Sequence, residues 1–590
     1  MTEVFDAAGA AAPPAGPLDL ERRKVLLIIG ALMLGMLLAA LDQTVVSTAL
    51  PTIVGDLGGA SHIAWIVTAY LLTSTVSTPL WGKLGDLYGR KAFFQASIVI
   101  FLVGSALSGV SQSLSMLIAF RALQGLGAGG LMVGAQSIVG DVVPPRERGR
   151  YQGMFGAVFA VTTVVGPLLG GFLTQHASWR WVFYLNLPIG AVALVVTAAV
   201  LPGNLARIRR VIDYWGALLL TLSVTAFVLL VSLGGVTYAW GSAPIFVLGA
   251  SGVALLVAWS VVERTAAEPI LPLRLFANKT FSATSAIGFV VGFALFGGVT
   301  FLPVFLQVSR GVDPTTSGLQ LLPLMGGLLF TSVASGLLIS RWGRYKVFPV
   351  VGTAVMTLGL YLLSTVHAGT SNGLMSLYMV VMGLGIGGVM QVLVIAVQNA
   401  VRHEDLGVAT AGATFFRSIG GSFGAAIFGA IFSNVLRGQL AADLRGVPLP
   451  KNLGDSVSPA LLQQLPATIL HGVRTAYATS FDTVFLVAVP IGAVAFLLTW
   501  LLPELRLRSG GDGAHGADAA GGDGVVAPAA GGDAGDAGGA GGAAVGLPAV
   551  GSAAPAFTEA DGDGADAGDA WGGAGGPGQP TAAGDRRPGS

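Results

Sequence analysis

The sequence predicts an all-α integral membrane protein with fourteen transmembrane helices, built as two six-helix bundles with two further helices inserted between them. Its 590 residues are 53% hydrophobic and only 10% charged, and the mean hydropathy is +0.76. This leaves too few charges to cover the surface of a water-soluble globule. Apolar runs of about 20 residues, the length that a helix needs to cross a bilayer, recur along the chain. Motifs of the first half also return in the second half, which indicates an internal repeat.

The apolar runs define the predicted spans in chain order. The first six are 25-47, 63-81, 93-110, 115-137, 151-173 and 181-201. The two inserted spans are 214-235 and 243-262. The second set of six is 281-308, 319-340, 347-366, 374-399, 410-436 and 481-503.

The distribution of Lys and Arg supports this count, because cytosolic loops of membrane proteins carry an excess of basic residues. With the N-terminus in the cytosol, each inside loop as far as Lys346 holds a basic cluster, whereas the short outside loops hold only Arg180 and Arg310. One span more or fewer would reverse the later loops and destroy the pattern. We therefore expect a multi-pass protein of the cytoplasmic membrane with both termini in the cytosol.

Two repeated motifs set the domain boundaries. QGLGAGGLM at 124-132 returns as MGLGIGGVM at 382-390, and GKLGDLYGR at 82-90 returns as GLLISRWGR at 336-344. The nearly constant offset indicates two parallel bundles with a binding cavity between them. The predicted domains are a cytosolic segment 1-24, an N-terminal bundle 25-201, two inserted helices with linkers 202-280, a C-terminal bundle 281-503 with an outside loop 437-480, and a disordered, acidic, Gly/Ala-rich cytosolic tail 504-590.

Several function classes are excluded by missing or misplaced motifs. The two glycine-rich repeats match the dinucleotide-binding pattern, but they lie inside apolar spans, so we interpret them as sites of close helix packing. The chain has no P-loop motif, no zinc-protease motif and no cysteine. We expect no enzyme, no metal site, no cofactor and no nucleic-acid partner, and a gradient as the source of energy.

Asp42 is a carboxylate inside the apolar run of the first predicted span, and it is the main candidate for a functional residue. A charge at membrane depth costs about 2.5 to 3.5 kcal/mol on insertion scales, so such a residue normally faces a partner or a cavity. At 1.5 Å per residue, Asp42 lies about 27 Å along its helix from Lys24, and Arg121 lies about 9 Å inside the outer end of its span. The two charges are thus at similar depth, and they are buried at lowest cost when they face each other or share a wet cavity.

Two interpretations of this pair are open. It is either a static ion pair that locks the bundle, or a site of proton coupling. Desolvation favours a protonated carboxyl and a nearby guanidinium favours an ionised one. Alternate exposure of Asp42 to water and to Arg121 would therefore let it bind and release a proton. We adopt this as the hypothesis.

Other polar and aromatic residues within the spans are candidates for lining a cavity, with helix packing as the alternative for each. Arg417 lies about 10 Å inside its span with no carboxylate at its level. It could bind backbone carbonyls, face a wet cavity or contact an anionic ligand. The full set of candidates is Gln43, Thr44, Gln124, Phe296, Phe301, Gln307, Gln391, Gln398, Asn399, Phe415 and Arg417.

The loop at 82-91, GKLGDLYGRK, has glycines that permit a tight reversal and basic residues that fix topology. It resembles the signature loop of the major facilitator superfamily. In that family the loop is a cytoplasmic gate that stabilises one access state. The resemblance implies a major facilitator fold and gate residues Gly82, Asp86, Gly89, Arg90 and Lys91.

Three further stretches resemble motifs of the fourteen-span drug:proton antiporter branch of this family. LDQTVVSTALP at 41-51 is similar to the first-helix motif, with Ser47 where Asn is usual. IAFRALQGLGAGG at 118-130 is similar to the fourth-helix motif. GPLLGG at 166-171 is similar to the fifth-helix antiporter motif, with Thr162 where a glycine is expected. The antiporter motif implicates Gly153, Gly166, Pro167, Gly170 and Gly171.

The resemblance implies a proton-coupled efflux transporter for lipophilic compounds, cationic ones among them. Its partners would be a small-molecule substrate, protons and the lipid bilayer, and a monomer would suffice, although the oligomeric state stays open. One alternative is export of an endogenous metabolite or antibiotic. Another is a non-transporting membrane sensor or scaffold whose tail recruits a partner.

Overall fold

The computed structural model describes residues 21–57, 63–201, 203, 213–235, 237–299, 301–312, 314–367, 369–443 and 466–507. Within these ranges the regular structure is helical, with one isolated bridge between Gly234 and Tyr238. The predicted N-terminal segment as far as residue 20 and the predicted tail from residue 508 lie outside the described residues.

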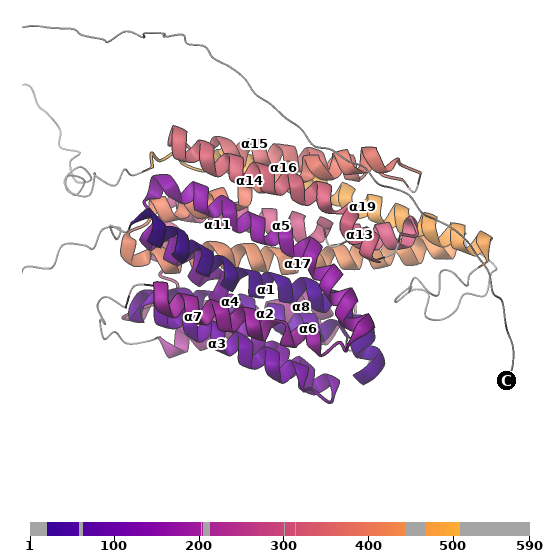
Figure 1. Ribbon diagram of the computed structural model, residues 1–590. Coiled ribbons are helices and arrows are strands. Elements are labelled where there is room, and N and C mark those ends of the chain that lie inside the picture. Colours follow the sequence, from indigo (N-terminus) through magenta and orange to yellow (C-terminus); the bar gives the residue numbers. More distant parts are fainter. Residues whose placement is uncertain are drawn as a thin grey trace, which may run out of the picture. The chain divides into compact units, whose positions relative to one another are not determined.

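The N-terminal bundle contains the helices α1 to α7 (Figure 1). They are α1 (Arg22–Leu57), α2 (Ile63–Tyr88), α3 (Arg90–Gly109), α4 (Leu114–Val142), α5 (Pro145–His176), α6 (Trp181–Tyr184) and α7 (Asn186–Val200). In the figure α3, α4 and α7 lie side by side, and α4 packs closely on both α2 and α3. The inserted helices α8 (Tyr214–Leu233) and α9 (Ala243–Thr265) pack against each other.

The C-terminal bundle begins after the short helix α10 (Arg274–Ala277). Its elements are α11 (Lys279–Val299), α12 (Leu302–Val304), the π-helix η2 (Phe305–Ser309), α13 (Pro314–Gln320), α14 (Leu322–Trp342), α15 (Val347–Leu363), α16 (Asn372–Ala400), the 3₁₀ turn η3 (His403–Asp405), α17 (Leu406–Asp443) and α19 (Ala467–Trp500). Here α16 packs on α14 and α15 as α4 packs on α2 and α3. This equivalence supports the predicted repeat.

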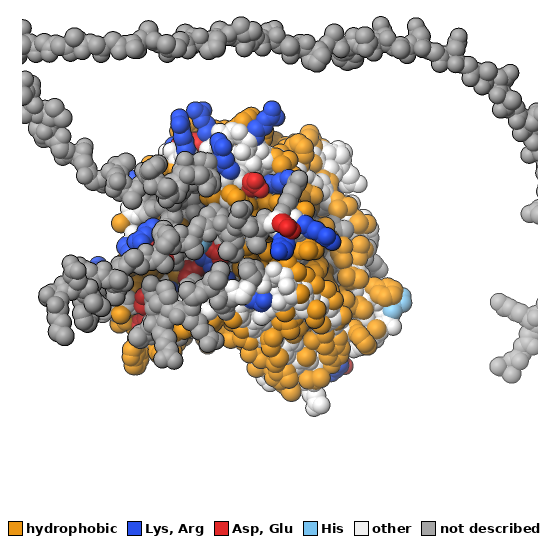
Figure 2. Space-filling view, turned by 60° about the vertical axis from the view of Figure 1, so that its left-hand side comes forward, with side chains coloured by type: hydrophobic (Ala, Val, Ile, Leu, Met, Phe, Trp, Pro, Cys, Tyr) orange, Lys and Arg blue, Asp and Glu red, His pale blue; other side chains and the backbone are white. Residues whose placement is uncertain are grey.

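Each predicted span overlaps a helix of the structure. By length and composition, eleven helices of the described part are able to cross a membrane, and Lys279–Leu295 and Val347–Leu363 are shorter apolar helices. The all-helical membrane fold is thereby confirmed, whereas the count of fourteen crossings stays a prediction. Figure 2 shows hydrophobic side chains over most of one face and Lys and Arg gathered over a limited part of it.

Two spans predicted as continuous are broken, and prolines explain both breaks. Proline has no N–H and its ring clashes with the carbonyl four residues earlier. The span 181-201 is divided at Leu185, between α6 and α7, three residues before Pro188. The span 281-308 ends its first helix at Val299 and continues through α12, which contains Pro303, into the π-helix η2.

Two loop boundaries are also corrected. The outside loop predicted for 437-480 is helical at both ends, because α17 continues to Asp443 and α19 begins at Ala467, and residues 444–465 lie outside the described part. The predicted tail begins too early. Glu504 and Leu505 are bound to Tyr345, whose backbone N–H donates to Glu504 Oε1 (3.2 Å) and whose hydroxyl accepts from the Leu505 N–H (3.2 Å).

The glycine-rich repeats pack as predicted. A Cβ placed on Gly125 would lie 2.3 Å from the Tyr70 carbonyl oxygen of α2, and one on Gly127 would lie 2.5 Å from the Phe101 nitrogen of α3. In the second bundle a Cβ on Gly383 would lie 2.0 Å from the Leu324 carbonyl oxygen of α14. These distances confirm close helix packing and leave no basis for a nucleotide-binding interpretation.

Candidate functional site

The two intramembrane charges of the N-terminal bundle are in contact. α1 places Asp42 and α4 places Arg121 so that Arg121 Nη1 lies 2.5 Å from Asp42 Oδ2. Both residues are only 1% exposed. The two residues, which helix rise places at similar depth, thus form a direct ion pair that is sealed from solvent in this state.

Two amides complete the partners of the carboxylate. Gln124 Nε2 donates to Asp42 Oδ1 (2.8 Å), while Gln124 Oε1 accepts from Arg121 Nη1 (2.8 Å). Asn186, the first residue of α7, donates to Asp42 Oδ1 (3.0 Å) and to the Ser105 hydroxyl of α3 (3.0 Å). Three helices, α1, α4 and α7, therefore meet at one carboxylate, and α3 supports it through the Ser105 contact to Asn186.

Aromatic rings and a carbonyl hold the other side of Arg121. The guanidinium carbon lies 4.1 Å from the ring centre of Tyr70 and 5.9 Å from that of Phe183. Arg121 Nε donates to the Ile66 carbonyl oxygen (3.4 Å). A guanidinium over a buried aromatic face is stabilised by a cation–π interaction that strengthens as water is removed. The arginine is thus held by α2 as well as by Asp42.

Sequence reasoning missed Asn186, Ser105 and Tyr70. Asn186 had a detectable signal, since it is an amide inside an apolar run beside the helix break. Ser105 and Tyr70 had none, because serine and tyrosine are common in membrane helices and only packing shows which of them face the pair.

The antiporter-motif glycines bring α5 onto α1 beside Asp42. A Cβ on Gly166 would lie 2.0 Å from Thr44 Oγ1, and one on Gly170 would lie 2.0 Å from Thr48 Oγ1. The Thr44 hydroxyl donates to the Thr162 carbonyl oxygen (3.1 Å). Thr44 is therefore a packing residue, two positions from Asp42. A Cβ on Gly171 would meet nothing within 4 Å.

The segment at 82-91 is not a ten-residue loop. It is helical as far as Tyr88 and again from Arg90, and the reversal is made by Gly89 alone, whose φ of 100° suits glycine. Gly82 lies within α2, where a Cβ would lie 2.4 Å from Ala411 Cβ of α17. The absence of a side chain at Gly82 allows α2 and α17 of the two bundles to approach closely. Lys91 donates to the carbonyl oxygens of Ala198 and Leu201, both at 2.7 Å.

Asp86 joins the two bundles at this turn. Its Oδ2 accepts from the Val408 N–H (2.8 Å) at the start of α17, and its Oδ1 accepts from Arg90 (2.8 Å). Burial raises the pKa of the Asp86 carboxyl, which lies beyond the predicted span 63-81, to about 6. Arg90 also pairs with Asp141 Oδ1 (3.0 Å). These contacts join the two bundles at the turn for which the resemblance implies a gate.

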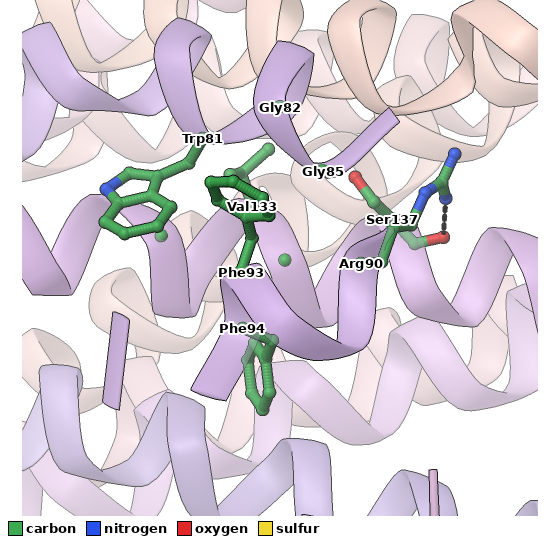
Figure 3. Close-up of a pocket in the computed structure, with 10 residues that line it drawn as sticks. Trp81, Gly82, Gly85, Arg90, Phe93, Phe94, Val133 and Ser137 are labelled. Atoms are coloured by element: carbon green, nitrogen blue, oxygen red, sulfur yellow. Dashed lines mark hydrogen bonds between the residues drawn. The ribbon is translucent and has the colours of Figure 1, made fainter. Parts of the chain in front are cut away.

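Behind the turn the packing is tight. Figure 3 shows Trp81, Phe93 and Phe94 around a cavity of about 10 Å³, with Arg90 donating to the Ser137 carbonyl oxygen. A water molecule needs about 10 to 15 Å³, so this cavity holds one water at most. It is no substrate site.

Further contacts close the same end. A Cβ on Gly336 of α14 would lie 2.0 Å from the Gly149 carbonyl oxygen of α5, and one on Gly153 would lie 2.8 Å from the Ser332 carbonyl oxygen. Gln398 of α16 donates to the Gln136 carbonyl oxygen of α4 (3.0 Å). These contacts involve α4 and α5 from one bundle and α14 and α16 from the other.

The structure distributes the candidate cavity residues over different surroundings. Gln124 belongs to the Asp42 network, Asn399 donates to the Arg506 carbonyl oxygen (3.2 Å), and Phe415 is buried against Phe416. Gln391 is buried with its Oε1 unpaired. The half-buried candidates are Gln43, Phe301, Gln307 and Arg417.

The remaining candidate and motif residues are Phe296, Arg417 and Pro167. The Phe296 side chain lies outside the described part. Among the described residues Arg417 has no hydrogen-bond or ion-pair partner. Pro167 faces α13, where a Cβ on Gly318 would lie 3.6 Å from Pro167 Cβ.

The profile of the Major Facilitator Superfamily matches residues 32–425. This chain belongs to the major facilitator superfamily. Membership confirms the membrane transporter fold predicted from the sequence and accounts for the absence of enzyme motifs.

Curated relatives in this superfamily are similar over most of the chain. An MFS-type transporter of Mycobacterium tuberculosis strain H37Rv is 47% identical over 511 residues, which is 85% of this chain and 74% of that protein. Multidrug transporter protein MdtP of Bacillus subtilis is 38% identical, covering 83% of this chain and 95% of that protein. The Acurin A biosynthesis cluster MFS-type transporter of Aspergillus aculeatus is 34% identical over 82% of this chain and 90% of that protein.

Solved major facilitator structures share the fold. The proton:xylose symporter XylE superimposes with a TM-score of 0.55 at 13% identity, covering 83% of this chain and 98% of that one. The identity is too low for this likeness to show more than the fold.

Among the described residues of this major facilitator fold, the Asp42–Arg121 pair lies in the N-terminal bundle. The repeat aligns Asp42 and Arg121 near Ala294 and Met379, which are buried apolar residues. The pair is therefore not duplicated at the equivalent described positions of the second bundle.

Proposed function

We propose that this protein is a proton-coupled antiporter that exports lipophilic compounds, cationic ones among them, across the cytoplasmic membrane. The observation that carries the proposal is the Asp42–Arg121 pair, buried to 1% exposure and held by Gln124 and Asn186. A bundle that needed only stability could use apolar packing here, since replacing a buried ion pair by apolar residues is often neutral or stabilising. The names of the multidrug relatives support the direction of transport.

In the proposed cycle, the described state is the one in which Asp42 and Arg121 are paired. Three donors, one of them the Arg121 guanidinium, surround the carboxylate, and the pair is sealed from water. To take up a proton, Asp42 has to separate from Arg121 and meet water from one side of the membrane. When the bundle returns, the guanidinium again favours the ionised form and the proton leaves.

Helix α5 supplies the physical link between this exchange and the movement of the bundles. At one end it contacts α14 through Gly149 and Gly153, and further along it contacts α1 through Gly166 and Gly170. Because these contacts are backbone-close, a movement of α5 relative to α14 and α1 would be transmitted to Thr44, two residues from Asp42. Opening the cytosolic end would thus disturb the surroundings of the carboxylate.

A second candidate function is export of a metabolite made by the host itself. The fungal relative named for a biosynthesis cluster favours this reading. Both functions use the same proton coupling and differ only in the compound carried.

The test is reconstitution of the purified full chain in proteoliposomes with an imposed pH gradient. A panel of cationic, anionic and neutral lipophilic compounds is presented, and both compound accumulation and internal pH are recorded. The proposal predicts that at least one compound accumulates against its gradient while protons move the other way. Absence of compound-dependent proton movement across the panel would contradict it.

A further inference from the structure

A cavity of about 440 Å³ lies in the C-terminal bundle, at the end that the topology predicts to face outside. It is formed where η2 ends and where α16 and α19 begin. The residues that line it include Arg310, Gln320, Asn372, His471, Arg474 and Thr475. None of the described residues that line this cavity is acidic. The volume is in the range of about 300 to 1,000 Å³ typical of small-molecule sites.

Arg474 of α19 has no partner for its positive charge among the described residues. Its Nε is buried and has no hydrogen-bond partner, and no ion pair with Arg474 occurs among the described residues. The side chain is half-buried, with its Nη2 2.5 Å from the position that a Cβ on Gly311 would take. A buried donor left unpaired costs free energy. The guanidinium is therefore positioned for a ligand or for ordered water.

Arg310 differs in being held in place by the protein. Its Nη2 donates to the Thr370 carbonyl oxygen and its Nη1 lies 3.1 Å from Met375 Sδ. These are neutral partners, so its positive charge is not compensated. Two guanidiniums thus line this cavity, and none of its described lining residues supplies a carboxylate.

Neighbouring elements add to the positive potential. Asn372 is the first residue of the 29-residue helix α16, whose N-terminus carries a partial positive charge. On α19 the nearest acid after Arg474 is Asp482, and it is occupied by His367 Nδ1 at 3.6 Å. The described groups that line the cavity are therefore neutral or basic, with Arg310 and Arg474 among them.

We propose that this cavity binds an oxyanion, a carboxylate or phosphate group carried by a small or amphipathic molecule, with Arg474 as the main contact. A guanidinium presents planar paired donors that match such a group, and a charge-assisted bond would satisfy the buried Nε. The oxyanion would come from a soluble compound or from the headgroup of an anionic phospholipid. The site is separate from the Asp42 network and does not depend on proton coupling.

The experiment uses the full chain in nanodiscs of phosphatidylcholine and measures the thermal midpoint of unfolding. Inorganic phosphate and benzoate are titrated against chloride at equal ionic strength. We expect at least one of the two anions to raise the midpoint in a saturable way, and Arg474→Gln to weaken that response about tenfold or more, because a charge-assisted bond is lost. Arg437→Gln is the matched control, since Arg437 is an exposed arginine of α17 that bonds only the Ser433 carbonyl oxygen of its own helix.

A second arm separates the two sources. In nanodiscs that contain phosphatidylglycerol, a headgroup site predicts a higher midpoint for the wild type than for Arg474→Gln and a weaker response to soluble anions. A site for soluble compounds predicts the same response in both discs. Arg474→Lys keeps the charge without the planar fork, and it replaces the glutamine variant if that one does not fold.

The proposal is overturned if neither soluble anion nor phosphatidylglycerol stabilises the wild type beyond chloride. It is equally overturned if the wild type, Arg474→Gln and Arg437→Gln respond alike, because the effect is then general screening. In either case ordered water alone satisfies Arg474.

Discussion

Each carboxyl oxygen of Asp42 has a hydrogen-bond donor inside the N-terminal bundle. Oδ2 faces Arg121, while Oδ1 accepts from Gln124 and Asn186. Removing one partner of a buried ion pair costs far more folding free energy than replacing both partners, because it leaves an uncompensated buried charge. This asymmetry gives the pair a signature in stability as well as in transport.

The first prediction uses this asymmetry. Arg121→Gln should lower the free energy of unfolding by about 3 to 5 kcal/mol, because it leaves the Asp42 carboxylate buried and uncompensated. Adding Asp42→Asn should restore most of the loss, since no charge is then buried. The measurement is the thermal midpoint in detergent for the two variants and the wild type.

Arg180→Gln is the control for this series. Arg180 pairs with Asp56 at 3.2 Å, but the two side chains are 34% and 52% exposed, so solvent screens the pair and its loss should change the midpoint little. A double variant that melts as low as Arg121→Gln would contradict the account of the network.

Asp86 gives the cytosolic contact a pH dependence. Burial raises the pKa of its carboxyl from the ordinary 3.8 to about 6, so the contacted state binds the proton more tightly than a separated state in which Asp86 meets water. The contact should therefore become more stable as the pH falls from about 6 toward about 4. Spin labels on Arg150→Cys and Arg341→Cys, in a chain without other cysteines, should report a rising short-distance population over that range.

Asp86→Asn serves as the control, since it removes the titrating group and should make the distance distribution independent of pH. A wild-type background whose distances ignore pH, or an Asn variant that keeps the response, would refute this assignment.

At the scale of single residues the sequence predicted the charged pair but not its shell. Asp42 and Arg121 could be matched because charges are rare inside apolar spans and helix rise gives their depth. Asn186 and Tyr70 could not be assigned, since helix rotation decides which polar side chains point inward and short motifs do not determine rotation. The contact of Lys91 with the end of α7 could not be predicted for the same reason.

Among the helices, α5 packs closely against both bundles. Its glycines contact α14 near its first residues and contact α1 beside Asp42. The motif resemblance marked Gly166, Gly170 and Gly171 alike, but the structure separates them. Only the first two lie against α1.

This separation yields a prediction within one motif. Gly166→Ala and Gly170→Ala should impair pH-driven export strongly, by about tenfold or more, because a methyl group would overlap a threonine of α1 and force the helices apart. Gly171→Ala should export at the wild-type level, because no atom lies within 4 Å of the added carbon. Transport is compared in proteoliposomes at equal protein content.

Equal impairment by all three substitutions would show that the motif acts through something other than the α1–α5 contact. Normal export by Gly166→Ala would have the same meaning.

Helix positions followed from apolar runs, whereas helix ends and breaks did not. Gly89 was one of two glycines expected to make the reversal, and the structure uses it alone. The breaks at Leu185 and after Val299 follow from Pro188 and Pro303, yet Pro79, Pro167 and Pro490 lie inside unbroken helices. Whether a proline interrupts a helix depends on whether neighbours satisfy the freed carbonyl, and a sequence does not show those neighbours.

For the molecule as a whole, the transporter account places the mechanism in the membrane helices. Residues 504–507 extend beyond the last span, and Glu504 and Leu505 of this segment bind Tyr345. The alternative of a sensor or scaffold instead places function in the acidic tail.

Deleting residues 509–590 distinguishes these accounts. The deletion leaves the Tyr345 contacts intact, so pH-driven export should remain at the wild-type level. Export that disappears while the truncated chain still folds and reconstitutes would favour the tail-dependent alternative. Size-exclusion chromatography and the thermal midpoint check the fold.

The central claim is that Asp42 carries the proton, and one comparison tests it most directly. Asp42→Asn is reconstituted beside the wild type, and two activities are measured with the same compound: accumulation driven by a pH gradient, and exchange of labelled for unlabelled compound without a gradient. We predict that the variant retains exchange but loses gradient-driven accumulation, because the bundles still move and no proton is coupled to them. An Asp42→Asn protein that accumulates the compound as the wild type does would contradict the account.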